Sequence, residues 1–213
     1  MRHRKRPYRI VDCSNLDHEI RLDRHVPVRR DGDTHVSYSP RVSEEAQHFV
    51  RVAGVEDVDS IGWLLHEFNR EFNEPTPSPS ALANRFRSLL GGGDTFVLLA
   101  GDAPDGLAVL RYRMAIWSSG LECYLAELYV VPALRRTGIG RALMTAAMEE
   151  ARRRGADTMD IGVDEPDEAA RGLYESLGFS HRTSGPDGPV MYVYERDLYA
   201  GTECRGEAPP GFR

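Results

Sequence analysis

The chain has 213 residues, 41% of them hydrophobic, and a formal net charge of −6 at pH 7. This length can build one stable core, so one domain with an N-terminal extension is the simplest partition. No apolar run approaches a membrane span and no signal-peptide core follows the basic start, so neither a membrane protein nor an exported one is predicted. The three cysteines lack metal-ligand spacing and cannot all pair within the chain, and the histidines do not cluster. This pattern favours a reducing, cytoplasmic setting without a metal site.

Basic residues crowd the start of the chain, where nine of the first thirty residues are arginine or lysine. Residues 1–47 therefore read as a variable basic extension. Because this arm lacks interleaved aromatic residues, a loosely docked tail is favoured over a nucleic-acid contact. A folded domain is predicted over residues 48–198, and residues 199–213 are expected to form a disordered tail.

Apolar periodicity and turn residues predict alternating strands and helices along the domain. The predicted strands span residues 48–53, 95–100, 107–117, 121–131, 158–163 and 191–198. The predicted helices span residues 55–72 and 80–90, residues 137 to about 155, and residues 167–177. We expect a mixed α/β fold in which helices flank a central, largely antiparallel sheet, with a parallel pairing between the strands at 121–131 and 158–163.

Residues 128–143 read LYVVPALRRTGIGRAL, an apolar strand followed by a basic turn that opens a long amphipathic helix. Gly138 and Gly140 allow close backbone approach to an anion, and the first N–H groups of a helix attract negative charge. Arg135, Arg136 and Arg141 add positive charge. The spacing excludes a dinucleotide fingerprint, and Gly-Lys-Ser/Thr of a P-loop is absent. A phosphate site is favoured over a simple connection with solvated arginines.

A second motif, ARGLYESLGF at residues 170–179, lies beyond this helix. Together with Arg-x-x-Gly-x-Gly at residues 135–140, it makes residues 48–198 resemble the GNAT superfamily of acyl-CoA-dependent N-acetyltransferases. The resemblance implies that the basic turn wraps the pyrophosphate of coenzyme A. It also implies that one sheet strand pairs through its backbone with the pantetheine arm, in a slot between two splayed strands.

The resemblance assigns acetyl-CoA as the co-substrate and carries its contacts over to particular positions. Asp167 departs from the family pattern because many members have asparagine there, and Thr137 stands where glycine is frequent. The implied contact residues are Leu128, Tyr129, Val130, Arg135, Arg136, Thr137, Gly138, Ile139, Gly140, Arg141 and Asp167.

Acetyl transfer to an amine needs a base, because a primary amine with a pKa near 10.4 is protonated at neutral pH. Glu127 borders the coenzyme-contacting backbone and is the first candidate, with Glu122 as the alternative. The resemblance places the Tyr174 hydroxyl by the thioester sulfur as the acid and the Val130 N–H on the thioester carbonyl. Cys123 is read as a small core residue rather than a nucleophile, which favours direct transfer.

We therefore expect an N-acetyltransferase that moves an acetyl group from acetyl-CoA to a small cationic amine in a ternary complex. The alternatives are acetylation of a protein N-terminus or lysine, and a module that senses acyl-CoA without turnover. The resemblance also makes a homodimer a reasonable expectation.

Overall fold

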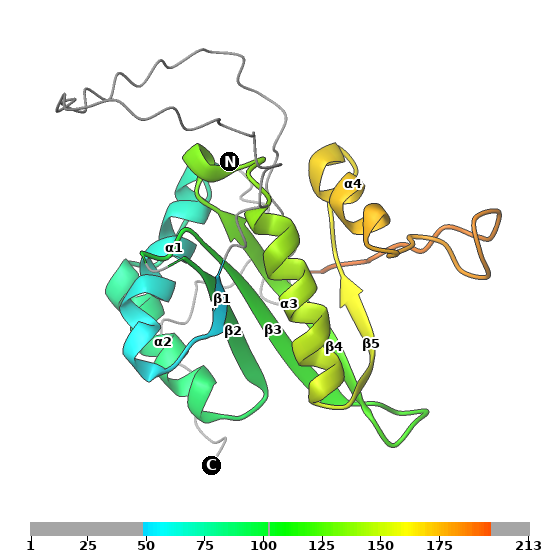
Figure 1. Ribbon diagram of the computed structural model, residues 1–213, viewed down its shortest axis with the longest axis horizontal. Helices are drawn as coiled ribbons and strands as arrows, with labels where there is room; N and C mark the ends of the chain where they lie inside the picture. Colours follow the sequence, from blue (N-terminus) through cyan, green and yellow to red (C-terminus); the bar gives the residue numbers. More distant parts are fainter. Residues whose placement is uncertain (1–48, 102, 197–213) are drawn as a thin grey trace, which may run out of the picture.

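The computed structural model describes residues 49–101 and 103–196, which form a five-stranded sheet with helices on both faces (Figure 1). The strands are β1 (Val50–Val52), β2 (Thr95–Ala100), β3 (Gly106–Met114), β4 (Leu121–Val130) and β5 (Ala156–Ile161). The helices are α1 (Val58–Glu71), α2 (Pro79–Gly91), α3 (Ile139–Arg153) and α4 (Glu168–Ser176), with short 3-10 turns η1 (Val55–Asp57) and η2 (Pro132–Leu134). The predicted extension 1–47 and tail 199–213 lie outside the described residues.

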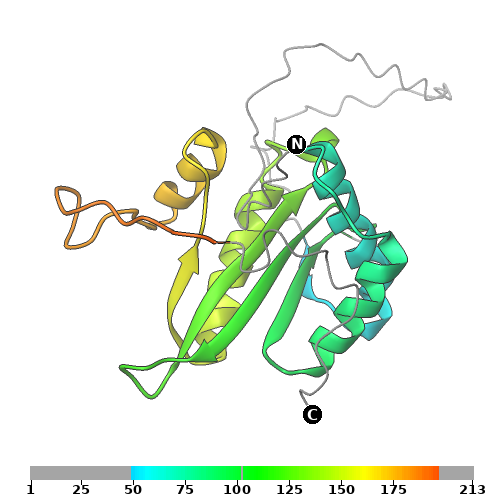
Figure 2. The same ribbon diagram turned by 180° about the vertical axis from the view of Figure 1, so that it is seen from behind.

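The sheet order is β1-β2-β3-β4-β5, with antiparallel pairing from β1 to β4 and parallel pairing between β4 and β5. This confirms the predicted mixed fold and its parallel pair. Helices α1 and α2 cover one face of the sheet and α3 lies on the other, as the views from the front and from behind show (Figure 2). The parallel pair is possible because α3 carries the chain back across the sheet from the end of β4 to the start of β5.

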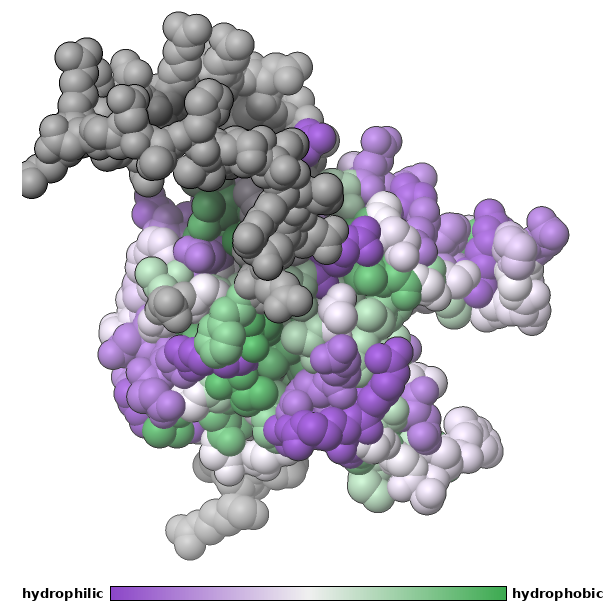
Figure 3. Space-filling view, viewed as in Figure 1, coloured by the Kyte–Doolittle hydropathy of each residue, from purple (hydrophilic) through white to green (hydrophobic). Residues whose placement is uncertain are grey.

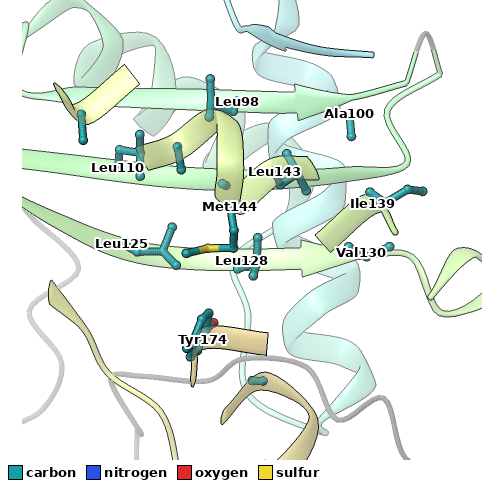
Figure 4. Packing of buried hydrophobic residues seen from close by; sticks show 14 of the residues in the cluster. Leu98, Ala100, Leu110, Leu125, Leu128, Val130, Ile139, Leu143, Met144 and Tyr174 are labelled. Atoms are coloured by element: carbon teal, nitrogen blue, oxygen red, sulfur yellow. The ribbon is translucent and has the colours of Figure 1, made fainter. Parts of the chain in front are cut away.

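Helix α3 is amphipathic, and its apolar side packs on the sheet. Leu143, Met144 and Ala147 are fully buried among residues from β2, β3 and β4 (Figure 4). Burying one such leucine stabilises the fold by roughly 1.5–3 kcal/mol. The space-filling view shows apolar surface between α2 and α3, while polar side chains follow the outer side of α3 (Figure 3). This packing fixes where the N-terminus of α3 meets the end of β4.

The opposite face of the sheet carries a second core under α1 and α2. Ile61, Leu64 and Phe68 of α1 pack against β2, β3 and Tyr129 of β4. Gly62 allows α1 and α2 to approach closely, because a Cβ there would lie 2.4 Å from the Pro79 carbonyl oxygen. The helix pair is thereby held against the β4 side that faces away from α3.

The predicted closing strand at residues 191–198 is wrong in the part that the structure describes. Residues 191–196 have no strand pairing, and only a single bridge joins Arg182 to Val190 before them. A short turn explains the difference. The backbone N–H groups of Thr183 and Met191 donate to Pro189 and His181 respectively, so this segment pairs with itself rather than with β5.

Smaller differences concern the ends of elements. Strand β3 ends at Met114, three residues before its predicted end, and β5 begins two residues early, at Ala156. Gly155 adopts a left-handed φ of 85°, which ends the α3 segment and lets the strand begin at once. None of the helices among the described residues is long and apolar enough to cross a membrane.

Candidate active site

Strands β4 and β5 separate halfway along β4. Their parallel pairing ends at Leu125 and Ile161, whereas β4 continues to Val130 while pairing with β3 on its other side. The last five residues of β4, 126–130, therefore have no ladder partner on the β5 side. Backbone N–H and C=O groups in an unpaired strand end can bind an extended ligand as an added strand. The predicted contact residues Leu128, Tyr129 and Val130 all lie in this part of β4.

A β-bulge in β4 sets the direction of Glu127. Val109 pairs with Glu127 and the next residue of β3, Leu110, pairs with Leu125, so Ala126 is the extra residue. Before the bulge, Leu125 belongs to the core under α3, and after it Leu128 belongs to the same core. Since side chains alternate along a strand, Glu127 shares the face of Tyr129, toward α1 and α2. Without the bulge its carboxyl would point into the core under α3.

The carboxyl of Glu127 is partly buried, and burial raises its pKa to about 8. A carboxyl with this pKa takes up and releases protons near neutral pH, as a general base requires. Glu122, the alternative base, has a different setting. It pairs with Arg113 at 2.5 Å and lies opposite Thr158, where β4 and β5 are still joined. The geometry therefore favours Glu127 over Glu122 as the group beside the open part of β4.

The raised pKa of Glu127 makes stability depend on pH. Because the folded state holds the proton more tightly than the unfolded state does, stability falls as pH rises from about 4.5 to about 8. Glu127→Gln removes this loss. We expect the variant to match the wild type near pH 5 and to be more stable by on the order of 2 kcal/mol near pH 9. Urea unfolding at both pH values measures the difference, and equal stabilities at the higher pH would show that the carboxyl is well solvated.

The turn between β4 and α3 has the backbone of an anion site. Gly138 is the N-cap residue of α3 with a left-handed φ of 99°, and no side chain caps the helix. The first N–H groups of a helix are unpaired within the helix and carry a positive partial charge. Ile139 is buried and anchors this first turn. At Gly140 a Cβ would have only ordinary contacts, 3.6 Å from Leu173 and 3.9 Å from Val130, so a methyl group there would fit without a clash within the chain.

The polar side chains of this turn have distinct settings. Thr137 donates its hydroxyl to the Leu134 carbonyl and braces the turn, and Arg141 donates to Ser176 of α4 at 2.9 Å. Arg136 has a left-handed φ of 64° and no recorded partner among the described residues. Arg135, in contrast, is almost buried, with 11% of its side chain exposed. The three arginines predicted to contact phosphate therefore differ in exposure and in hydrogen-bond partners.

Tyr174 and Asp167 belong to α4. Asp167 is the N-cap residue, and its carboxylate accepts the Ala170 N–H at 3.0 Å, so the aspartate that replaces a family asparagine begins this helix. Tyr174 is 4% exposed and packs edge-on against Phe179. Figure 4 shows its ring beside β4, near the stretch from Leu125 to Leu128. The tyrosine thus lies next to the strand whose outer side is open.

Cys123 lies in the core under α3. Burial raises the pKa of its thiol to about 11. Such a thiol is almost fully protonated at neutral pH and a poor nucleophile. This supports the reading of Cys123 as a packing residue. In the part of the chain that the structure describes, no three His, Cys, Asp or Glu side chains gather as metal ligands do.

Sequence reasoning missed Glu71, which lies at the C-terminal end of α1 and forms an ion pair with Arg135. A weak signal was present. Glu67 on the same helix has Arg70 as a local partner, whereas Pro75 stands four residues after Glu71, where a helical partner would be expected. Because Glu71 has no cation at helical spacing after it, its carboxylate can pair with a cation from a distant part of the chain, here Arg135.

A mixed sheet with a splayed parallel pair and an uncapped glycine turn places the chain in the class of acyl-CoA-binding transferase folds. The family model described as "Acetyltransferase (GNAT) family" matches residues 61–179. This match covers more than half of the chain, and the chain belongs to the GNAT acetyltransferase family.

Two curated relatives illustrate its range. The mycothiol acetyltransferase of Thermobispora bispora is 33% identical over 153 residues, 69% of this chain and 46% of the relative. The [ribosomal protein bS18]-alanine N-acetyltransferase of Escherichia coli is 40% identical over 87 residues, 41% of this chain and 52% of the relative. The chain thus spans about half the length of the curated relatives it matches.

Solved structures share the fold. One from Arthrobacter sp. FB24 has a TM-score of 0.66 and 40% identity, covering 71% of this chain and 97% of its own. An aminoglycoside acetyltransferase from an uncultured soil metagenomic sample has a TM-score of 0.55 and 26% identity, covering 67% and 97% respectively. The relatives carry different acceptors in their names, so they do not identify the acceptor of this chain.

Proposed function

We propose that the chain is an N-acetyltransferase that moves an acetyl group from acetyl-CoA directly to a small cationic primary amine. The observation that carries the proposal is the position of Glu127. Its partly buried carboxyl, with a pKa raised to about 8, stands beside the open half of β4, one residue from the backbone that leads to the uncapped turn of α3. Glu127, the open edge of β4 and the uncapped turn of α3 thus follow one another along the chain, as a proton acceptor, a strand edge and an anion site.

The residues present fit acetyl-CoA. The first N–H groups of α3 and the charge of Arg136 suit a pyrophosphate, and the absence of a side chain at Gly140 lets that group approach the backbone. The unpaired edge of β4 at residues 128–130 suits the amide-bearing pantetheine arm. When bound, acetyl-CoA supplies an acetyl thioester.

Each candidate residue has one task in this proposal. Glu127 accepts a proton from the acceptor ammonium, directly or through water, so that the amine nitrogen has a free electron pair. The Val130 N–H polarises the carbonyl under attack, where negative charge develops. The Tyr174 hydroxyl gives a proton to the leaving sulfur. Direct transfer is favoured because the thiol of Cys123 is buried and protonated.

A cationic acceptor fits the charges on the α1 side of β4. Burial raises the pKa of the Tyr129 hydroxyl, and the negative charge of Glu71 raises it further while Arg135 lowers it. Because Arg135 neutralises Glu71, the ionised form of Glu127 supplies the negative charge that would attract a cationic acceptor on this face. A protein N-terminus is the second candidate acceptor, because the bS18-alanine acetyltransferase is 40% identical over the matched segment.

An acceptor panel tests the proposal. Thiol release from acetyl-CoA is measured with polyamines, aminoglycosides, amino acids and a peptide that begins with alanine. We expect turnover with at least one small cationic amine and little with the peptide. Preference for the peptide selects the second candidate, and binding of acetyl-CoA without turnover on any amine selects an acyl-CoA-sensing module.

Gly140 provides a separate test of the coenzyme site. We expect Gly140→Ala to weaken acetyl-CoA binding about tenfold or more, because its methyl group stands where the backbone meets phosphate. The fold should tolerate the change, since the added Cβ lies 3.6 Å from its nearest neighbour. Calorimetry measures the affinity. Gly172→Ala on α4 is the matched control, with nothing within 4 Å of its Cβ. Equal affinities for the two folded variants would remove the turn from the site.

A further inference from the structure

The side chain of Arg135 is directed into the protein. Its two terminal nitrogens donate to the two carboxylate oxygens of Glu71 at 2.7 and 2.6 Å, and its Nε donates to the Val130 carbonyl at 3.0 Å. The guanidinium carbon lies 5.8 Å from the centre of the Tyr129 ring. At least three of the five N–H groups of the arginine therefore have partners within the chain.

These contacts join two parts of the molecule that have separate tasks in the proposed reaction. Glu71 ends α1, in the helix layer on the Glu127 face of β4, and Val130 ends the strand at the start of the phosphate turn. Figure 1 shows the end of α1 beside the turn that precedes α3. A bidentate arginine–carboxylate pair has a fixed geometry, so it holds the two segments in one relative position.

We propose that Arg135 is a positioning residue whose pair with Glu71 fixes the phosphate turn and the Val130 carbonyl against α1. The inference rests on the proposed function, because it assigns the role of one arginine in the same coenzyme site. It changes the expectation from sequence, in which Arg135 was a phosphate contact. Through this pair, the helix layer on the acceptor side is linked mechanically to the binding of acetyl-CoA.

Electrostatics favour this role over direct phosphate binding. Glu71 neutralises the charge of Arg135 at close range, so the pair offers a distant anion little net attraction. To reach a phosphate, the guanidinium would have to break its bidentate pair with Glu71. The Glu71 side chain, which is only 27% exposed, would then be left without this cation. Arg136 has neither constraint and remains able to supply positive charge to the pyrophosphate.

The direction in which Glu71→Gln changes the affinity for acetyl-CoA distinguishes a positioning role of Arg135 from direct phosphate binding. If Arg135 positions the turn, Glu71→Gln and Arg135→Gln each weaken acetyl-CoA binding about tenfold. The double variant then binds acetyl-CoA no more weakly than the single variant with the lower affinity, because both substitutions break the same pair. The dependence of affinity on salt stays that of the wild type, because no charge that touches the ligand is lost. If Arg135 binds phosphate, Glu71→Gln frees it and affinity stays the same or improves, while Arg135→Gln flattens the salt dependence.

Calorimetry over a range of salt concentrations, well below the melting temperature of each variant, makes the measurement. Glu67→Gln is the matched control on the same helix, because the Glu67 side chain is 30% exposed and pairs with Arg70 among the described residues, and the variant should bind like the wild type. Unchanged or tighter binding by folded Glu71→Gln overturns the inference while leaving the proposed function intact. Failure of the wild-type protein to bind acetyl-CoA would instead overturn the proposed function.

Discussion

Replacement of Tyr174 by phenylalanine is expected to slow turnover by roughly 10²–10⁴-fold while acetyl-CoA affinity stays nearly unchanged. The change removes one oxygen atom and keeps the ring that packs against Phe179. Thiolate is a charged leaving group, and a phenol with a pKa near 10 can give it a proton as the bond breaks. Since this proton moves only during the reaction, the loss should appear in kcat rather than in ground-state binding.

The measurement pairs steady-state kinetics on the best acceptor with calorimetry of acetyl-CoA. Tyr112→Phe is a suitable control, because it removes another buried tyrosine hydroxyl, on the residue that pairs with Cys123 across the sheet and lies away from the open part of β4. We expect that variant to lose some stability and keep its turnover. Wild-type turnover by Tyr174→Phe would make Tyr174 a packing residue and leave the departing sulfur to be protonated by water.

The parts of the fold set by local patterns were predictable from sequence. Strand β2 has its predicted bounds, Thr95–Ala100, because an apolar run there lies between clear turn signals. Helix α3 follows its 3.6-residue apolar period, and the parallel pairing of β4 with β5 follows from the helical crossover between them. Each of these features depends on a periodicity within one segment or on a short connection.

The bulge in β4 had a signal that was not used. Apolar core residues fall on odd positions at Cys123 and Leu125 and on even positions at Leu128 and Val130, and this change of phase requires one extra residue. Reading it would have placed Glu127 away from the core under α3. The prediction of the closing strand was wrong because the β-branched and aromatic residues at 192–194 favour a strand locally, but a local preference cannot supply a neighbouring strand to pair with.

The sequence carried only a weak signal for the pair of Glu71 and Arg135, namely that Glu71 has no cation at helical spacing after it. The two residues are 64 positions apart, and nothing in either segment names the other as its partner. Only the packing of α1 beside the phosphate turn brings them together. The sequence thus predicted which segments form the candidate site, while the roles of its individual charged side chains depend on long-range packing.

Glu127→Gln should have the second large effect, a loss of about 10²-fold in kcat/KM for the amine at neutral pH. The substitution keeps the shape of the side chain but removes its ability to take a proton. Because burial raises the pKa of Glu127 to about 8, wild-type kcat/KM should rise with pH and level off above that value. The variant lacks this inflection. Its rate should follow the free amine instead, rising up to the pKa of the amine, about 10.

Paired pH–rate profiles of Glu127→Gln and Glu122→Gln assign the base. The deficit of Glu127→Gln should shrink above pH 8, because more of the amine is then unprotonated without help. If Glu127 only binds a cationic acceptor, the Michaelis constant rises and higher pH does not restore the rate. Loss of the inflection in Glu122→Gln would move the role to Glu122, whose ion pair with Arg113 makes this the less expected result. If both profiles match the wild type, neither carboxylate is the base, and the amine must lose its proton to water.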